Sequence, residues 1–257
     1  MRPMRPREVP GKGARAPKPW VVEVPDLWIA RLMVFPILAA LAFAAPYAVM
    51  TRAEDVFYNH CHAMHVVPTI SASTSGTLEG RIWATAVTFS CVLRALVVAP
   101  LYTCNGPRRW LQIATREGEI AALAVLALVQ IDDNSVVHTS ATGVWIFFSW
   151  VNLLPVALAG PVSRRDAKRR NVVLTFLLSQ LIGLLAFAFH NLWCWTGALT
   201  IFAVAEWVGV LTNMLYHFRN ISTAWSSGRG RQLLVVVGGD GPPAATTVEG
   251  PRSTGEM

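Results

Sequence analysis

The stretch HNLWCWTGALTIFAVAEWVGVLTNMLYH, residues 190–217, decides how the rest of this chain is arranged. The apolar run that begins within it, residues 195–218, is long enough to cross a bilayer, because a membrane-spanning helix needs about 20 mostly apolar residues. The segment therefore predicts one transmembrane helix. A very short turn that carries His190, Asn191 and Cys194 is expected to precede this helix.

Three polar side chains interrupt this apolar helix. Glu206, Asn213 and His217 follow one another at intervals of seven and four residues, so they share one helix face. An ionisable side chain inside a membrane is costly and faces protein or a water-filled cavity. The sequence therefore predicts that this face points toward other helices of a bundle.

The composition places the whole chain in the membrane class. Of its 257 residues, 53% are hydrophobic and only 14% are charged, which is too little charge for the surface of a soluble domain of this length. The net charge of +7 comes from basic residues confined to a few segments. Such a distribution reports orientation in a membrane, and no nucleic-acid partner is expected.

Hydropathy predicts an all-α fold, a bundle of six transmembrane helices within residues 27–219. A basic, proline-rich tail (1–26) and a tail rich in Ser, Gly and Pro (220–257) flank the bundle, and both are expected to be disordered. The six spans are expected at residues 27–50, 82–103, 110–131, 140–162, 171–189 and 195–218.

The distribution of Arg and Lys predicts the orientation of this bundle. Basic residues concentrate in both tails and in the turns at 105–109 and 163–170, which the positive-inside rule assigns to the cytosol. Both termini are therefore expected to be cytosolic. The long loop at 54–81 and the turns at 131–138 and 190–194 then face the lumen, so three polar segments meet at one surface.

Two of these luminal turns contribute a candidate catalytic group. His138 and His190 each border a short turn that packs against the bundle, and neutral imidazole is the usual general base for deprotonating a hydroxyl. Asp133 could orient such a base, as carboxylates do in acyl-transfer sites. The alternative is a structural role in which these side chains only form hydrogen bonds.

The long luminal loop also contains His60, His62 and His65. Histidine is favourable at a membrane interface, and the pattern H-x-H-x-x-H imposes no ligand geometry in a loop. We therefore expect no metal ion, and the alternative is a zinc site formed by this trio.

Charged residues within the spans predict a polar cluster inside the membrane. Arg94 is expected twelve residues into its span and Glu206 eleven into its own, roughly 17 Å from the luminal end in both cases, and Glu119 reaches a similar depth. Because a lone buried charge is very costly, we expect these three to lie together, near Asn213 and His217. The cluster is interpreted as a structural device that fixes helix register, with an ion or proton pathway as the alternative.

Two of the four cysteines face the lumen in this topology. Cys61 lies in the long loop and Cys194 in the last luminal turn, and an oxidising compartment permits a disulfide between them. The alternative is two separate thiols. Cys91 is expected to pack within a span, and Cys104 to remain reduced in the cytosol.

The chain resembles the Frag/DRAM/Sfk family of six-span membrane proteins over roughly residues 55–220. In the last span and the turn before it, the resemblance is carried by His190, Asn191, Cys194, Gly197, 200–203, Glu206, 210–214 and His217. Elsewhere it is carried by Glu119, Leu126, His138, Cys61, 68–71 and Arg81.

The resemblance implies a Golgi or endoplasmic reticulum membrane protein that matures glycosylphosphatidylinositol (GPI)-anchored proteins. In that pathway an anchor that has lost one acyl chain is reacylated with a saturated one. The implied activity is therefore of the acyltransferase type, with an acyl donor of unknown identity and no other cofactor. The implied partners are GPI-anchored proteins, their lyso-lipid and membrane lipid.

In this interpretation His138 or His190 is the base for the lyso-lipid hydroxyl. The residues expected to bind substrate are Asn191, Pro68, Ser71 and Arg81. The alternative function is a non-enzymatic lipid-binding or trafficking factor, as the resemblance to the wider family also implies. An ion transporter is a third class, and it would require pH-driven flux that depends on Glu206.

Overall fold

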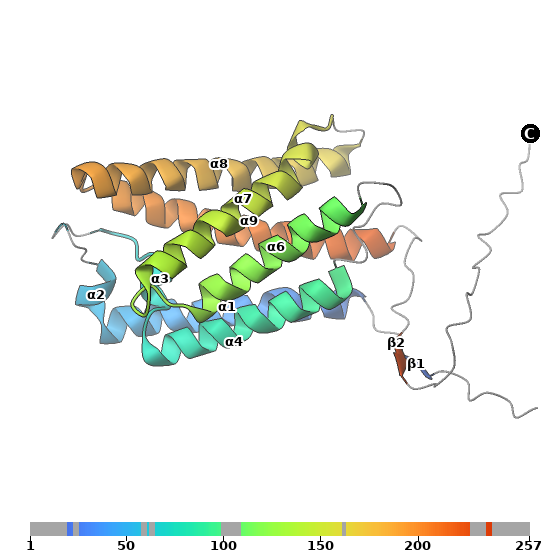
Figure 1. Cartoon of the computed structure of the whole chain (residues 1–257), viewed down its shortest axis with the longest axis horizontal. Coiled ribbons are helices and arrows are strands. Elements are labelled where there is room, and N and C mark those ends of the chain that lie inside the picture. Colours follow the sequence, from blue (N-terminus) through green and yellow to red (C-terminus); the bar gives the residue numbers. More distant parts are fainter. Residues whose placement is uncertain are drawn as a thin grey trace, which may run out of the picture. The chain divides into compact units, whose positions relative to one another are not determined.

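The computed structural model describes residues 20–22, 26–57, 61, 65–98, 109–160, 163–226 and 235–237. The helices are α1 (Asp26–Thr51), α2 (Ala53–Phe57), α3 (Ile70–Ser73), α4 (Thr77–Leu93), α6 (Arg109–Leu128), α7 (Ser135–Leu158), α8 (Arg164–Trp193) and α9 (Ala198–Ser226). The last turn of α4 continues as a short π-helix, η1 (Arg94–Val98). The long helices run side by side, and the short helices α2 and α3 lie together at one end of them (Figure 1).

Two short strands form a separate compact unit. β1 (Trp20–Val22) pairs antiparallel with β2 (Val235–Val237), with Trp20 opposite Val237. The prediction of disorder throughout both tails missed this pairing. Its residues are β-branched or aromatic, the types that favour strands.

Four helices among the described residues are long and apolar enough to cross a membrane. They cover residues 27–51, 135–158, 166–193 and 198–219, in α1, α7, α8 and α9. These helices indicate a multi-pass membrane protein. The other two long helices pack against these four: α4 packs against α1, and α6 packs against α7.

Some helix bounds differ from the predicted ones, and the differences matter for the site. Helix α4 begins at Thr77, five residues before the expected Ile82, whereas α9 begins at Ala198, three residues after the expected Trp195. Depths counted from the starts of α4 and α9 therefore differ from the expected ones, so a residue of α4 lies deeper and a residue of α9 less deep than the sequence predicts. A shift of five residues corresponds to about 7.5 Å along a helix.

His190 and Asn191 belong to the last turn of α8, whereas the sequence placed them in the following turn. Helix α8 ends at Trp193, and the next residue, Cys194, caps it in a left-handed conformation (φ 48°, ψ 34°), with its N–H donating to the carbonyl of His190 at 2.8 Å. A residue in this conformation is a common helix terminator. The helix therefore continues through both polar residues before it stops.

The apolar core lies between α7, α8 and α9. Phe176 and Val173 of α8 are fully buried, and Trp145 of α7 meets Phe176 edge to face, with ring centroids 6.0 Å apart. Leu153 and Tyr216 complete this packing. The packed core fixes these helices relative to one another, and thus the residues that line the cavity described below.

Candidate functional site

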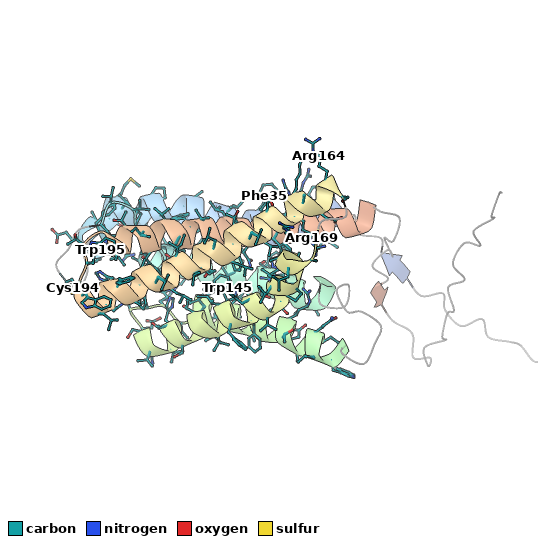
Figure 2. All side chains as sticks on the ribbon, turned by 90° about the horizontal axis from the view of Figure 1, so that it is seen from above. Phe35, Trp145, Arg164, Arg169, Cys194 and Trp195 are labelled. Carbon is teal, nitrogen blue, oxygen red and sulfur yellow. A yellow bond between two sulfur atoms is a disulfide. The ribbon has the colours of Figure 1, made fainter. Side chains whose placement is uncertain are left out.

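A disulfide ties the loop after α2 to the turn between α8 and α9. Cys61 and Cys194 are bonded, with their Cα atoms 5.7 Å apart, which confirms the disulfide that the sequence predicts. Figure 2 shows Cys194 and Trp195 at one end of the bundle, with Arg164 and Arg169 toward the other. The end with Cys194 is the disulfide end of the bundle, and the end with Arg164 and Arg169 is its basic end.

The loop that follows Cys61 is also held along α9. The N–H of Val66 donates to the hydroxyl of Thr200 at 3.3 Å, and the indole of Trp207 donates to the carbonyl of Pro68 at 2.8 Å. Thr69 then caps α3 by accepting a hydrogen bond from the N–H of Ala72. This short helix is therefore fixed against the middle of α9 by several bonds besides the disulfide.

Glu206 makes the strongest of these contacts. Its carboxylate accepts the N–H of Ile70 at 2.7 Å and the hydroxyl of Ser71 at 2.9 Å. The predicted cluster of Glu206 with Arg94 and Glu119 is therefore wrong. Glu206 lies about 12 Å from the start of α9, whereas Arg94 follows the whole of the 17-residue α4, about 26 Å of helix.

Arg94 and Glu119 form a buried ion pair deeper in the bundle. Their charged atoms are 3.1 Å apart, and the same guanidinium lies 2.8 Å from Nε2 of His217. The other carboxylate oxygen of Glu119 accepts a hydrogen bond from Asn152 at 2.8 Å. The cluster therefore contains three of the predicted residues and one that the sequence analysis did not include, Asn152.

His138 and Ser71 are brought together at the disulfide end of the bundle. Nε2 of His138 lies 3.3 Å from Oγ of Ser71, and Nδ1 lies 2.7 Å from the carbonyl oxygen of Val129. The carbonyl thus occupies the place that the sequence assigned to Asp133, whose prediction as the orienting group is wrong. Asp133 is exposed, because the turn is closed by its neighbour Asn134, whose side chain caps α7.

Two further histidines are buried near this group. His65 and His190 are each only 2% exposed. Burial lowers the pKa of His65 below its ordinary value of 6.5; backbone hydrogen bonds at Val56 and Phe57 act in the opposite direction, and the nearby His190 lowers it further. His65 is therefore neutral at neutral pH, held against the ring of Phe57.

These side chains surround one large cavity inside the bundle. It has a volume of about 1070 Å³, just above the range of about 300–1,000 Å³ typical of small-molecule sites. Polar residues at its disulfide end include His65, Ser71, His138, His190, Asn191 and Glu206. Polar residues at its deeper end include Arg94, Asn213 and His217, so the polar face of α9 points into the bundle, as predicted, and there lines one cavity.

Mostly apolar side chains line the space between these polar ends, and Ser179 and Gln180 of α8 also face the cavity. The apolar side chains include Leu126, Trp145, Phe202, Val210 and Met214, contributed by α6, α7 and α9. A chain of methylene groups would bury its apolar surface against these side chains. The cavity therefore suits a molecule with a long apolar part and a reactive or polar part at the disulfide end.

The remaining predicted site residues lie in different places. Asn191 lines the cavity, and its amide donates to the carbonyl of Phe187. Pro68 contributes only its carbonyl, to Trp207, and Arg81 is exposed on α4 and does not line the cavity. His60 and His62 of the possible zinc trio, and also Cys104, fall outside the described residues.

Sequence reasoning did not identify Arg52 and Glu79 as partners. Arg52, between α1 and α2, pairs with the buried Glu79 of α4 at 3.1 Å and also donates to the carbonyl of Ala72. Arg52 therefore links the end of α1 to both α3 and α4. Charges of both signs stand at each end of the long loop, Arg52 beside Glu54 and Glu79 beside Arg81, so the sequence does not specify which residues pair.

Most of the chain is similar to known proteins. A family model described as "Frag1/DRAM/Sfk1/Cwh43P N-terminal domain" matches residues 27–221. "Acyltransferase PGAP2" of Xenopus tropicalis is 27% identical over 224 residues, which cover 79% of this chain and 87% of that protein. "Post-GPI attachment to proteins factor 2" of Drosophila pseudoobscura pseudoobscura is 30% identical over 181 residues, 62% of this chain and 70% of that protein. No solved structure matches the chain.

Proposed function

Because the chain belongs to the Frag1/DRAM/Sfk1/Cwh43P family, we propose that its role in GPI-anchor maturation is a lipid-remodelling reaction. The reaction is the transfer of a saturated fatty-acyl chain to the hydroxyl of a lyso-GPI anchor. Two similar proteins carry the names acyltransferase and post-GPI attachment factor. The substrates are then the lyso-lipid of a GPI-anchored protein and an acyl donor.

The proposed orientation has six crossings, both termini in the cytosol, and the disulfide end in the lumen of the Golgi or endoplasmic reticulum. Two observations support it. The bond between Cys61 and Cys194 persists in an oxidising compartment. The basic residues 164–170 begin α8 at the opposite end, where the positive-inside rule expects them.

The observation that carries the proposal is the composition of the cavity. A mostly apolar volume of about 1070 Å³ meets imidazole, hydroxyl and carboxylate groups at its disulfide end, an arrangement that suits a lipid ester. The acyl chain occupies the apolar part, and the ester carbon lies at the disulfide end. His138 or His190 takes the proton of the attacking hydroxyl.

The reaction can be tested with purified protein in lipid nanodiscs. The protein is given a lyso-GPI-anchored substrate and a labelled acyl donor, and the formation of diacyl anchor is followed by mass spectrometry. His138→Ala and His190→Ala should each be compared with wild type, and the base should account for a loss of about 10²–10⁴-fold. Full activity in both variants would remove the catalytic assignment.

Two further variants control for lost structure and test the role of Asp133. His138→Gln retains a hydrogen-bonding group beside Val129 and Ser71, so its folded yield controls for lost structure. Asp133→Asn should retain full activity, because the side chain of Asp133 is exposed and another group orients His138. A large loss in Asp133→Asn would restore the sequence-based assignment of that residue.

A non-enzymatic lipid carrier is the second candidate function, because the same cavity would also hold a lipid without reacting with it. A carrier would retain stoichiometric lipid after purification and show no turnover with any acyl donor. Wild-type protein that exchanges lyso-anchor between vesicles, but never acylates it, would favour this alternative.

A further inference from the structure

Both ring nitrogens of His138 are directed at protein atoms. Nδ1 lies 2.7 Å from the carbonyl oxygen of Val129, and because a carbonyl can only accept, Nδ1 carries the hydrogen. In the neutral imidazole Nε2 then holds the free electron pair, and Nε2 lies 3.3 Å from Oγ of Ser71. The basic nitrogen of His138 therefore faces a protein hydroxyl.

The hydroxyl of Ser71 lies between two acceptors. It donates to Oε1 of Glu206 at 2.9 Å and approaches Nε2 of His138 at 3.3 Å. A hydroxyl has one hydrogen, so it can satisfy only one of them at a time. The longer contact is the kind that tightens in a nucleophile–base pair when substrate binds.

Ser71 is also placed where an acyl group can reach it. Its side chain lines the cavity, together with His138 and Glu206, and α3 is fixed by the N-cap of Thr69 and by the bond between Glu206 and Ile70. A nucleophile on a fixed element keeps its geometry from one turnover to the next.

We propose that Ser71 is the nucleophile of the acyl transfer and carries the fatty-acyl chain as an ester between donor and acceptor. This inference rests on the proposed function and adds a covalent intermediate to it. The donor is an activated fatty-acyl group, either the ester of a membrane phospholipid or an acyl thioester.

In the first half-reaction, Oγ of Ser71 attacks the acyl carbonyl carbon while Nε2 of His138 takes the hydroxyl proton. The bond between the carbonyl carbon and the donor's oxygen or sulfur breaks, and the imidazolium returns the proton to that leaving atom. The products are acylated Ser71, neutral His138 and the deacylated donor. Val129 holds the imidazole by Nδ1 throughout.

The second half-reaction uses the same base on the other substrate. Once acylated, Oγ of Ser71 has no hydrogen, so Nε2 of His138 is free to accept the proton of the lyso-lipid hydroxyl. That oxygen attacks the acyl carbon, the bond to Oγ breaks, and the proton returns to Ser71. One histidine thus serves both steps, as in other covalent acyl transfers.

The test is acyl trapping on the full-length protein in nanodiscs. Wild type is mixed separately with labelled phosphatidylcholine and with labelled acyl-coenzyme A, quenched with acid in the first turnover, and digested for mass spectrometry. One of these donors should place the label on the peptide that contains Ser71. The donor that does so identifies the source of the acyl group.

Three variants separate a nucleophile from a merely structural serine. Ser71→Ala should lose the label and lower reacylation by at least about 100-fold. Ser71→Cys should still accept the label, now as a thioester that neutral hydroxylamine removes, whereas the ester on Ser71 resists it. Ser73→Ala is the matched control, because Ser73 is buried on the same helix and does not line the cavity.

The possible results separate the covalent route through Ser71 from the proposed acyl-transfer function. Ser71→Ala that folds and retains near-full reacylation overturns the covalent route and leaves the proposed function intact. Wild type that reacylates but shows no labelled Ser71 in the first turnover does the same. Wild type that is labelled on Ser71 but never acylates lyso-anchor overturns the proposed acceptor alone, and wild type with neither label nor product overturns both.

Discussion

The carboxylate of Glu206 accepts the backbone N–H of Ile70 at 2.7 Å, so this half-buried acid joins α9 to the helix α3. The contact is between residues 136 positions apart in the chain. It replaces the expected contact of Glu206 with Arg94, and so the acid belongs to the disulfide end of the cavity.

Replacing Glu206 should separate its hydrogen-bonding role from its charge. Glu206→Gln keeps a carbonyl oxygen for the N–H of Ile70, and we expect nearly normal amounts of folded protein. Glu206→Leu leaves that N–H buried without a partner, which costs about 1–3 kcal/mol. Thermal unfolding in detergent measures both, and equal stability of the two variants would contradict the assigned contact.

The ion pair between Arg94 and Glu119 should dominate stability deeper in the bundle. Glu119→Gln leaves the guanidinium of Arg94 buried without its counter-charge, and removing one partner of a buried pair costs about 3–5 kcal/mol. Adding Arg94→Gln should recover part of this loss. The measurement is the free energy of unfolding across the double-mutant cycle.

A second double-mutant cycle, between Arg94 and Glu206, is the control for this coupling. Arg94→Gln and Glu206→Gln should be additive within about 0.5 kcal/mol, because distant residues without shared partners are independent. A coupling energy as large as that of the pair with Glu119 would show that Glu206 belongs to the deeper cluster after all.

Removing the disulfide should destabilise the protein and loosen α3. The bond joins residues 133 positions apart, for which the chain-entropy model gives at most about 5 kcal/mol; in a membrane-restricted chain the expected loss is smaller. Cys61→Ser and Cys194→Ser should lower the unfolding temperature equally, and the double variant should add nothing. Cys91→Ala, at a free buried cysteine, is the comparison.

Acid should destabilise the disulfide end through His65. Burial lowers the pKa of His65 in the folded protein, so the unfolded chain takes up a proton first as pH falls below about 6.5. The stabilisation is therefore complete above pH 6.5 and is lost as pH falls toward the lower pKa of the folded state. In His65→Gln the unfolding temperature should vary less with pH in this window; an unchanged pH profile would contradict the assignment.

The amino-acid sequence alone determined the membrane class, the long helices and the polar face of the last one. Hydropathy and the spacing of polar residues are properties of short segments, so the shared face of Glu206, Asn213 and His217 is readable from the chain, and all three face the cavity. The pairing of Cys61 with Cys194 also followed from a topology argument that needs only helix order.

Only the tertiary structure decided which polar group meets which. Helix α4 begins five residues earlier than predicted and α9 three residues later, which places Arg94 and Glu206 at different depths. The short helix α3 fills the place beside Glu206 and brings Ser71 to His138. Such contacts join segments far apart in the chain, and their register depends on the packing of all the helices at once, which no local pattern specifies.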